Sequence, residues 1–168
     1  LDSVEAGGIN NVAIGDHAGT AITTGDGNIA IGKDALETST TASHNTAVGF
    51  EALNKNTSGC FNQAVGSFAL GCNTEGCQNV AMGMSALIVN TTGDHNVAIG
   101  RLALTSNQTA DSNTAVGTES LKSNTTAAGN SALGYESLEA NTTGGVNVAV
   151  GYRALKSNTT AGNNVAIG

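Results

Sequence analysis

The sequence contains no proline and no tryptophan, and it has few aromatic residues of any kind. Three Phe and two Tyr among 168 residues are too few large side chains for the interior of a compact globular domain. The apolar residues, 39% of the chain, are mostly Ala, Val, Ile and Leu, which suit a thin core built by stacking repeats. The absence of proline is expected where most backbone N–H groups are needed for strand pairing.

Basic residues are also scarce: six Lys and Arg stand against thirteen Asp and Glu, for a formal charge of −7. This balance argues against a nucleic-acid partner, which requires a basic stripe. No apolar run approaches the roughly 20 residues of a membrane span, so we expect no membrane insertion. No signal peptide is present, but the chain starts without Met and stops inside a repeat. We therefore expect it to be part of a longer protein.

What the sequence does have is a strict internal repeat. The segment Asn11-Val12-Ala13-Ile14-Gly15 is the first of ten copies that follow one another every 17 residues. The copies begin at Asn11, Asn28, Asn45, Asn62, Asn79, Asn96, Asn113, Asn130, Asn147 and Asn164. Each copy reads Asn, a variable residue, Ala, an aliphatic residue and Gly, which we number as places one to five. A fixed period of this length indicates a solenoid.

The remaining places predict the shape of one coil. Places one to four fit a short strand, and Gly at place five allows a sharp turn. Place eight is Ala or Ser, place nine is Leu in eight of nine full copies, and places twelve to fourteen read Asn-Thr-Thr or close to it. We expect a second short strand at places seven to ten and a wide loop at the Asn-Thr-Thr segment. We expect residues 1–10 to be a lead-in or partial coil and residues 11–168 to be a single all-β, parallel β-solenoid (β-roll).

Two columns of stacked residues bear on assembly. Asn at place one either forms a hydrogen-bonded column along the rod or simply suits the turn before the strand. Alanine occupies place three in all ten copies, which indicates that its side of the strand is covered. We expect the aliphatic residue at place four and Leu at place nine to be the buried pair. Both sides of the strand would then be buried, which requires a partner, most simply further copies of the chain around a shared axis.

The repeat resembles the Asn-Val-Ala-Ile-Gly motif of trimeric autotransporter adhesin heads over nearly the whole chain. The longer unit, from Asn147 to Leu155 followed by Asn158-Thr159-Thr160, is also similar to repeats of phage tail-fibre proteins. The resemblance implies a left-handed β-roll wound as a homotrimer, with a structural or adhesive role and no enzymatic one. The coils are longer here than in adhesin heads, and we expect the extra residues to enlarge the Asn-Thr-Thr loop.

The functional expectation is a structural segment of an extracellular fibre, either a rigid shaft or an adhesive head of a surface adhesin or tail fibre. Such a segment would be a homo-oligomer and could bind a host or surface receptor. The alternative is a subunit of a glycosylated extracellular filament assembled by end-to-end stacking. An ice-binding solenoid is a third class, but the two Thr of each loop are adjacent in sequence, which disfavours a regular two-column Thr face.

Six loops match the N-glycosylation pattern Asn-x-Ser/Thr. Their asparagines all occupy place twelve: Asn56, Asn90, Asn107, Asn124, Asn141 and Asn158. Sugars on them would line one ridge of the rod. The other interpretation is that Asn-Thr-Thr is a hydrogen-bonding turn that carries no sugar.

The three cysteines lie close together in the sequence. Cys60 and Cys77 both occupy place sixteen of consecutive coils, so their Cα atoms should lie about 4.8 Å apart, within disulfide range. Cys72 would then be free or bridge to another chain. A zinc site is disfavoured because no His is near. His44 and His95 share place seventeen but lie three coils apart, too far to share a metal.

Enzymatic function finds no support in the sequence, and we expect no catalytic residues, cofactor or metal. The carboxylates at the corners, Asp34, Glu51, Glu119 and Glu136 among them, are expected to be solvated. A contact strip is expected instead where the corners become apolar in the middle of the chain, since contiguous exposed apolar residues usually mark a binding surface. Its members are Phe50, Phe68, Met84, Ile88, Val89 and Leu102. The other interpretation is that these side chains fold back over their own coils.

Overall fold

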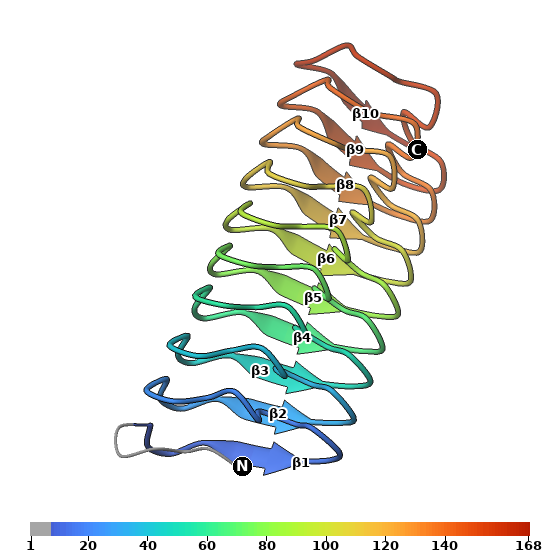
Figure 1. The fold of residues 1–168 in the computed structure, drawn as a ribbon. Coiled ribbons are helices and arrows are strands. Elements are labelled where there is room, and N and C mark those ends of the chain that lie inside the picture. The colour runs from blue at the N-terminus through green and yellow to red at the C-terminus, as the bar shows by residue number, and fades with distance from the viewer. Residues whose placement is uncertain (1–7) are drawn as a thin grey trace.

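The structure is a computed structural model that describes residues 8–168; residues 1–7, most of the expected lead-in, lie outside it. Ten three-residue strands form one parallel sheet in sequence order. They are β1 (Val12–Ile14), β2 (Ile29–Ile31), β3 (Thr46–Val48), β4 (Gln63–Val65), β5 (Val80–Met82), β6 (Val97–Ile99), β7 (Thr114–Val116), β8 (Ser131–Leu133), β9 (Val148–Val150) and β10 (Val165–Ile167). Figure 1 shows flat coils stacked from β1 to β10, with the strands along one side. The all-β, parallel solenoid with 17-residue coils is confirmed.

Each strand pairs with the next without any slip in register. In the middle of the rod Val80, Ala81 and Met82 lie opposite Val97, Ala98 and Ile99. Residues at the same place therefore form a column along the rod, with the roughly 4.8 Å spacing of paired strands. Residues at one place consequently share their burial and their neighbours from coil to coil, along one line on the surface or in the interior.

Glycine is invariant at place five for two physical reasons. Gly83 has a φ of 132°, a conformation that residues with a Cβ rarely adopt. A Cβ at this position would also lie 2.7 Å from the backbone carbonyl of Gly100 in the next coil. The corner is therefore both turned and stacked in a way that only glycine permits.

The predicted second strand at places seven to ten is wrong, because residues in the left-handed region interrupt it. In the third coil Glu51 at place seven has a φ of 53° and Leu53 at place nine has a φ of 50°. The other full copies repeat this pattern at the same two places, from His17 and Gly19 to Arg153 and Leu155. An extended strand cannot contain such residues. This part of the coil is a series of tight turns that direct the Leu side chain inward.

The core is made of small residues from one wall and leucine from the other. Ala81 at place three, Ala86 at place eight and Leu87 at place nine have no exposed surface, and the same columns form the buried cluster along the rod. The aliphatic residues at place four lie outside it, so the expectation that they pair with Leu in the core is wrong. The coil is too thin for two large walls, and alanine leaves the room that leucine fills.

The place-one asparagines form the predicted hydrogen-bonded column. The Oδ1 atom of each Asn accepts a bond from the backbone N–H of the next Asn, with nine such distances of 2.8–3.0 Å. The Nδ2 atom of Asn96 donates to the carbonyl of Ala110 at place fifteen, 2.8 Å away. These amides thus tie each coil to its neighbour, and most of them also close the coil on itself, which satisfies buried polar groups; the buried Nδ2 of Asn130 has no such partner among the described residues.

Candidate interaction surfaces

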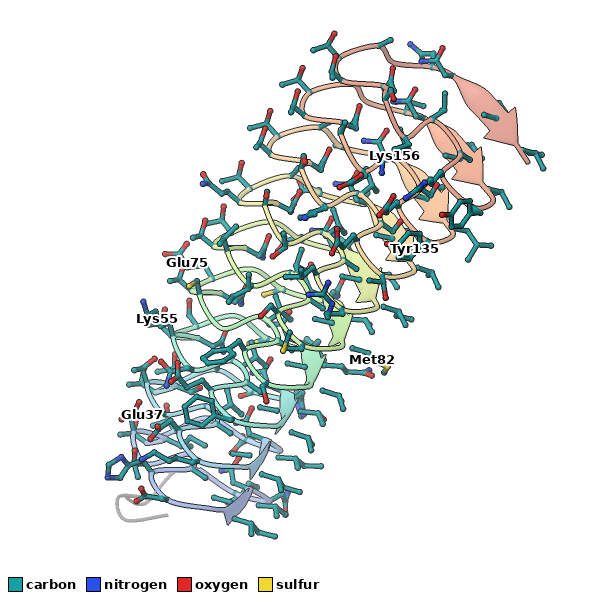
Figure 2. The ribbon with its side chains drawn as sticks, turned by 90° about the vertical axis from the view of Figure 1, so that its right-hand side faces the viewer. Glu37, Lys55, Glu75, Met82, Tyr135 and Lys156 are labelled. Atoms are coloured by element: carbon teal, nitrogen blue, oxygen red, sulfur yellow. The ribbon has the colours of Figure 1, made fainter. Side chains whose placement is uncertain are left out.

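The outward side of the strands, which we call the sheet face, is mostly apolar: place four is apolar in every strand, and place two is polar in four of the ten. Its place-two residues are Val12, Ile29, Thr46, Gln63, Val80, Val97, Thr114, Ser131, Val148 and Val165. Its place-four residues are Ile14, Ile31, Val48, Val65, Met82, Ile99, Val116, Leu133, Val150 and Ile167. In Figure 2 the labelled Met82 side chain points away from the coils on the strand side. Ile99 is 37% exposed and Leu133 is 50% exposed, so the chain itself leaves this surface open.

The dimensions of the sheet face are those of the largest apolar patch that a typical monomer exposes, and such patches are often functional. Ten strands spaced by about 4.8 Å extend for roughly 45 Å, and three residues of strand are about 10 Å wide. The flat footprint is thus on the order of 450 Å², comparable with the largest apolar patches of typical monomers. Place four contains only aliphatic residues and one Met along the rod. This uniformity is what a surface covered along its whole length requires.

The contact strip lies on a different part of the coils, after the strand. Phe50 and Phe68 belong to successive coils, and their rings meet edge to face with centroids 5.2 Å apart. Gly71 at place ten lies against the Phe68 carbonyl and the Ile88 side chain, which shows that places seven and ten are adjacent in space. Phe50 and Met84 are exposed, whereas the other four members of the strip (Phe68, Ile88, Val89 and Leu102) are half-buried. The strip therefore partly folds over its own coils, and its role as a contact stays a prediction.

The same columns are charged toward the C-terminal end. Glu136 at place seven accepts hydrogen bonds from the Lys156 ammonium and from Nε of Arg153, the latter at 2.7 Å. Only 9% of its side chain is exposed. Hydrogen bonds from Lys156, Tyr135 and Arg153 lower the pKa of the Glu136 carboxyl to about 2. Arg153 also lies over the rings of Tyr135 and Tyr152, which stack on each other with centroids 5.5 Å apart.

The expectation that corner carboxylates are solvated is wrong for three of the four residues. Besides Glu136, the side chains of Asp34 and Glu119 are each only 15% exposed. Glu119 pairs with Arg101 at 2.8 Å and with Lys122 at 3.0 Å. Lys122 lies three residues after Glu119 in the same coil, whereas Arg101 occupies place six of the preceding coil and becomes adjacent only when the coils stack. The sequence did not indicate this second pair.

One group of potential metal ligands also arises from this stacking. Oxygen and nitrogen atoms of His17, Asp34 and Glu37 lie within 4.8 Å of one another. The Nδ1 atom of His17 is 3.2 Å from Asp34, and Lys33 Nζ lies 3.6 Å from the same carboxylate. Lys33 Nζ also lies 2.8 Å from Asp16, so the group is part of a wider network of acidic and basic side chains.

The place-twelve asparagines that match the glycosylation pattern point into the coil. Asn56, Asn90, Asn107, Asn124 and Asn141 have no exposed surface, and only Asn158 in the last full coil is partly exposed. Each Nδ2 donates to the place-fifteen carbonyl of its own coil at 2.8–3.0 Å. Bonds of 2.8–3.2 Å also join neighbouring amides along the column. The folded coil buries these amides except that of Asn158, and the Asn-Thr-Thr segment is hydrogen-bonded as one interpretation expected. Glycosylation of these loops stays a prediction.

The threonines of the same loop form a further hydrogen-bonded column. Oγ1 of Thr125 donates to the Thr142 carbonyl at 3.2 Å, and Thr142 repeats the contact with Thr159 at 3.0 Å. The place-thirteen hydroxyls with this contact are committed to the backbone of the next coil. They do not form a free hydroxyl array of the kind that an ice-binding surface would use.

All three cysteines are free thiols, so the predicted Cys60–Cys77 disulfide is not formed. Parallel stacking directs the two side chains the same way and separates them by about one coil repeat, roughly 4.8 Å, whereas bonded cysteines bring their Cβ atoms to about 3.5–4.5 Å. The Cys77 sulfur accepts a hydrogen bond from the Cys60 N–H at 3.1 Å. Asp94 accepts the equivalent bond from the Cys77 N–H at 2.6 Å.

No pocket opens in the part of the chain that the structure describes, and within residues 8–168 no helix is long and apolar enough to cross a membrane. His44, the first of the two place-seventeen histidines considered above, stacks on Phe61 with ring centroids 5.0 Å apart.

No protein-family model, curated protein or solved structure matches this chain. Its surfaces are therefore interpreted from their own chemistry.

Proposed function

We propose that this chain is a rigid segment of an extracellular fibre, a shaft or an adhesive head, assembled from parallel copies that pack through their sheet faces. The observation that carries this proposal is the outward place-four column, which is apolar in every strand from β1 to β10. Removing such a surface from water contributes about 25 cal/mol for each Å² covered. The structural role is supported by this face and by the rod itself, which is stabilised along its length by the buried Ala and Leu columns and the hydrogen-bonded Asn columns.

A second copy of the chain is the partner that fits the sheet face best. A partner must be apolar over roughly 45 Å and must present side chains at the spacing of about 4.8 Å along the rod. Another copy in the same register meets both requirements at every coil. It also places Gln63 beside Gln63 and Thr114 beside Thr114, where polar side chains can hydrogen-bond to each other. Three copies around one axis would cover three such faces, which accords with the trimer that the repeat motif implies.

Side-by-side assembly is preferred to the end-to-end filament because only the former covers the sheet face. The buried place-twelve amides also weaken the support that glycosylation gave to the filament. In the proposed assembly the contact strip faces outward, where it is available to a host or surface receptor. The resemblance to adhesin heads and tail fibres favours the same role, with the left-handed coil of those proteins.

The experiment that tests the assembly compares two matched double variants by native mass spectrometry and sedimentation. Ile99→Glu with Leu133→Glu places two charges on the sheet face, whereas Thr109→Glu with Thr143→Glu places two on exposed loop positions of the same two coils. We expect the first variant to be monomeric and the second to remain a trimer, with unchanged β-sheet circular dichroism in both. A wild-type chain that is monomeric at all concentrations would contradict the proposal.

A further inference from the structure

The place-sixteen residues form a column of hydrogen bonds along the rod, and two members of this column are cysteines. From Ile9 to Asp94 the backbone N–H of each place-sixteen residue donates to the place-sixteen side chain of the following coil. The acceptors are Asp26, Ser43, Cys60, Cys77, Asp94 and Asp111, in that order. Oxygen is the acceptor everywhere except at Cys60 and Cys77. Hydrogen bonding alone does not require sulfur here, because Ser and Asp make the same contact.

The two thiols are related by a simple translation of one coil. Cys60 Sγ lies 3.3 Å from the carbonyl of Ser58, and Cys77 Sγ lies 3.3 Å from the carbonyl of Glu75, the residue at the equivalent place. Both side chains therefore have the same orientation, and stacking by one coil repeat is expected to place their sulfurs about 4.8 Å apart. This separation is more than twice the bond length of a disulfide, about 2.05 Å.

The same separation suits a metal ion placed between the sulfurs. Zinc–thiolate bonds are about 2.3 Å long, and an ion bound in line by two thiolates at about that length needs sulfurs roughly 4.6 Å apart. Soft monovalent ions such as Cu(I) and Ag(I) prefer thiolates and accept two ligands in a line. Both cysteines are partly exposed, so an ion can reach them from solvent.

We propose that Cys60 and Cys77 form a two-thiolate site for one soft monovalent metal ion that bridges the third and fourth coils. On binding, two S–H bonds break, two metal–sulfur bonds form and two protons pass to solvent, with no change of oxidation state. Binding consequently strengthens as pH rises, because the ligands must lose protons. Cys72 takes no part: it occupies place eleven, whose column contains no second cysteine.

The test uses the full chain, reduced and handled without oxygen, with Cu(I) supplied by a coloured chelator whose absorbance reports transfer of the ion. We expect wild type and Cys72→Ser to take up one Cu(I) per chain. Cys60→Ser and Cys77→Ser should bind at least about 10²-fold more weakly, because a second tethered ligand raises effective concentration by that order. Serine is tolerated in this column, since Ser43 accepts the N–H of Asp26 at 3.0 Å, and circular dichroism checks that both variants fold.

Three results would overturn the site. Unchanged affinity in Cys60→Ser or Cys77→Ser would show that single thiols bind the ion independently. Loss of binding in Cys72→Ser would place the ion elsewhere. Recovery of a Cys60–Cys77 disulfide by non-reducing peptide mapping of air-exposed protein would show that the sulfurs approach to bonding distance, which a separation of one coil repeat does not allow. Monomeric or trimeric protein gives the same expectations, so this test is independent of the proposed assembly.

Discussion

The two sides of each strand have opposite composition, and the side with the smaller residues is the core. Ala98 faces inward with no exposed surface, while Val97 and Ile99 on either side of it face outward. In most proteins the larger aliphatic residues would be expected inside. Here the interior is only one alanine and one leucine thick, so space and not apolarity decides which side is buried.

The inward residues stabilise the fold of a single chain, whereas the outward residues are available for contacts between chains. The inward columns of Ala, Leu and Asn are satisfied within a single chain. The outward Val and Ile columns contribute little to a lone coil and become useful only when another molecule covers them. Substitutions of the same chemical kind on the two sides should therefore have different consequences.

The largest difference is expected for leucine truncation. Leu87→Ala should lower the free energy of unfolding by about 2–5 kcal/mol, because a fully buried leucine leaves a cavity. Leu133→Ala removes the same atoms from the outward side, where half of the side chain is exposed. Its cost to a single chain should be below about 1 kcal/mol. Denaturant unfolding at several protein concentrations measures both.

The two leucine variants also report on assembly. If the sheet face is covered, the cost of Leu133→Ala should grow with protein concentration, while that of Leu87→Ala should not change by the same amount. Equal costs at high dilution would contradict the division of the strand into an inner and an outer side.

Enlargement should show the same asymmetry with a somewhat smaller effect. Ala81→Leu adds three carbons where Ala81 is completely buried, and overpacking of this kind costs about 1–3 kcal/mol or more. Val80→Leu enlarges the neighbouring residue on the outward side and should stay within about 0.5 kcal/mol for a single chain. Thermal unfolding of the two variants makes the comparison. A neutral Ala81→Leu would mean that the interior has space that the structure does not show.

The sequence predicted the repeat, the coil length, the parallel stacking and the Asn column, because strict spacing determines which residues stack. The sequence did not predict which side of each strand faces the core. Alternation shows that Ala81 faces away from Val80 and Met82, but it does not show which of them meets the core. The left-handed conformation of residues such as Leu53 was also hidden, since leucine has no local preference for it. Ion pairs such as Glu136–Lys156 were missed because they join places that become neighbours only in the folded rod.

The charged end of the outer surface should respond to pH, whereas the apolar middle should not. The pKa of Glu136 is about 2 in the folded chain, against about 4.3 for an unfolded glutamate. A lowered pKa stabilises the fold above the unfolded value, and this contribution is lost as pH falls from about 4.3 toward 2. We expect the Tm difference between wild type and Glu136→Gln to shrink over this range. A difference that stays constant from pH 6 to pH 2.5 would show that the carboxylate charge is not the cause.

The smallest expected effect is a gain in stability at a corner. Val146 at place seventeen has a φ of 57°, a conformation that costs an ordinary residue about 1–2 kcal/mol and a β-branched one at least as much. Asparagine adopts this conformation more readily, and Asn163 does so at the same place in the next coil with a φ of 59°. Val146 is also 62% exposed, so Val146→Asn gives up little packing and should raise the free energy of unfolding by about 1 kcal/mol. Val148→Asn is the matched control, because it makes the same change on the outward side of β9, where valine suits the extended backbone, and it should be neutral or destabilising. If both variants lose stability equally, backbone strain at the corner is not what distinguishes these two valines.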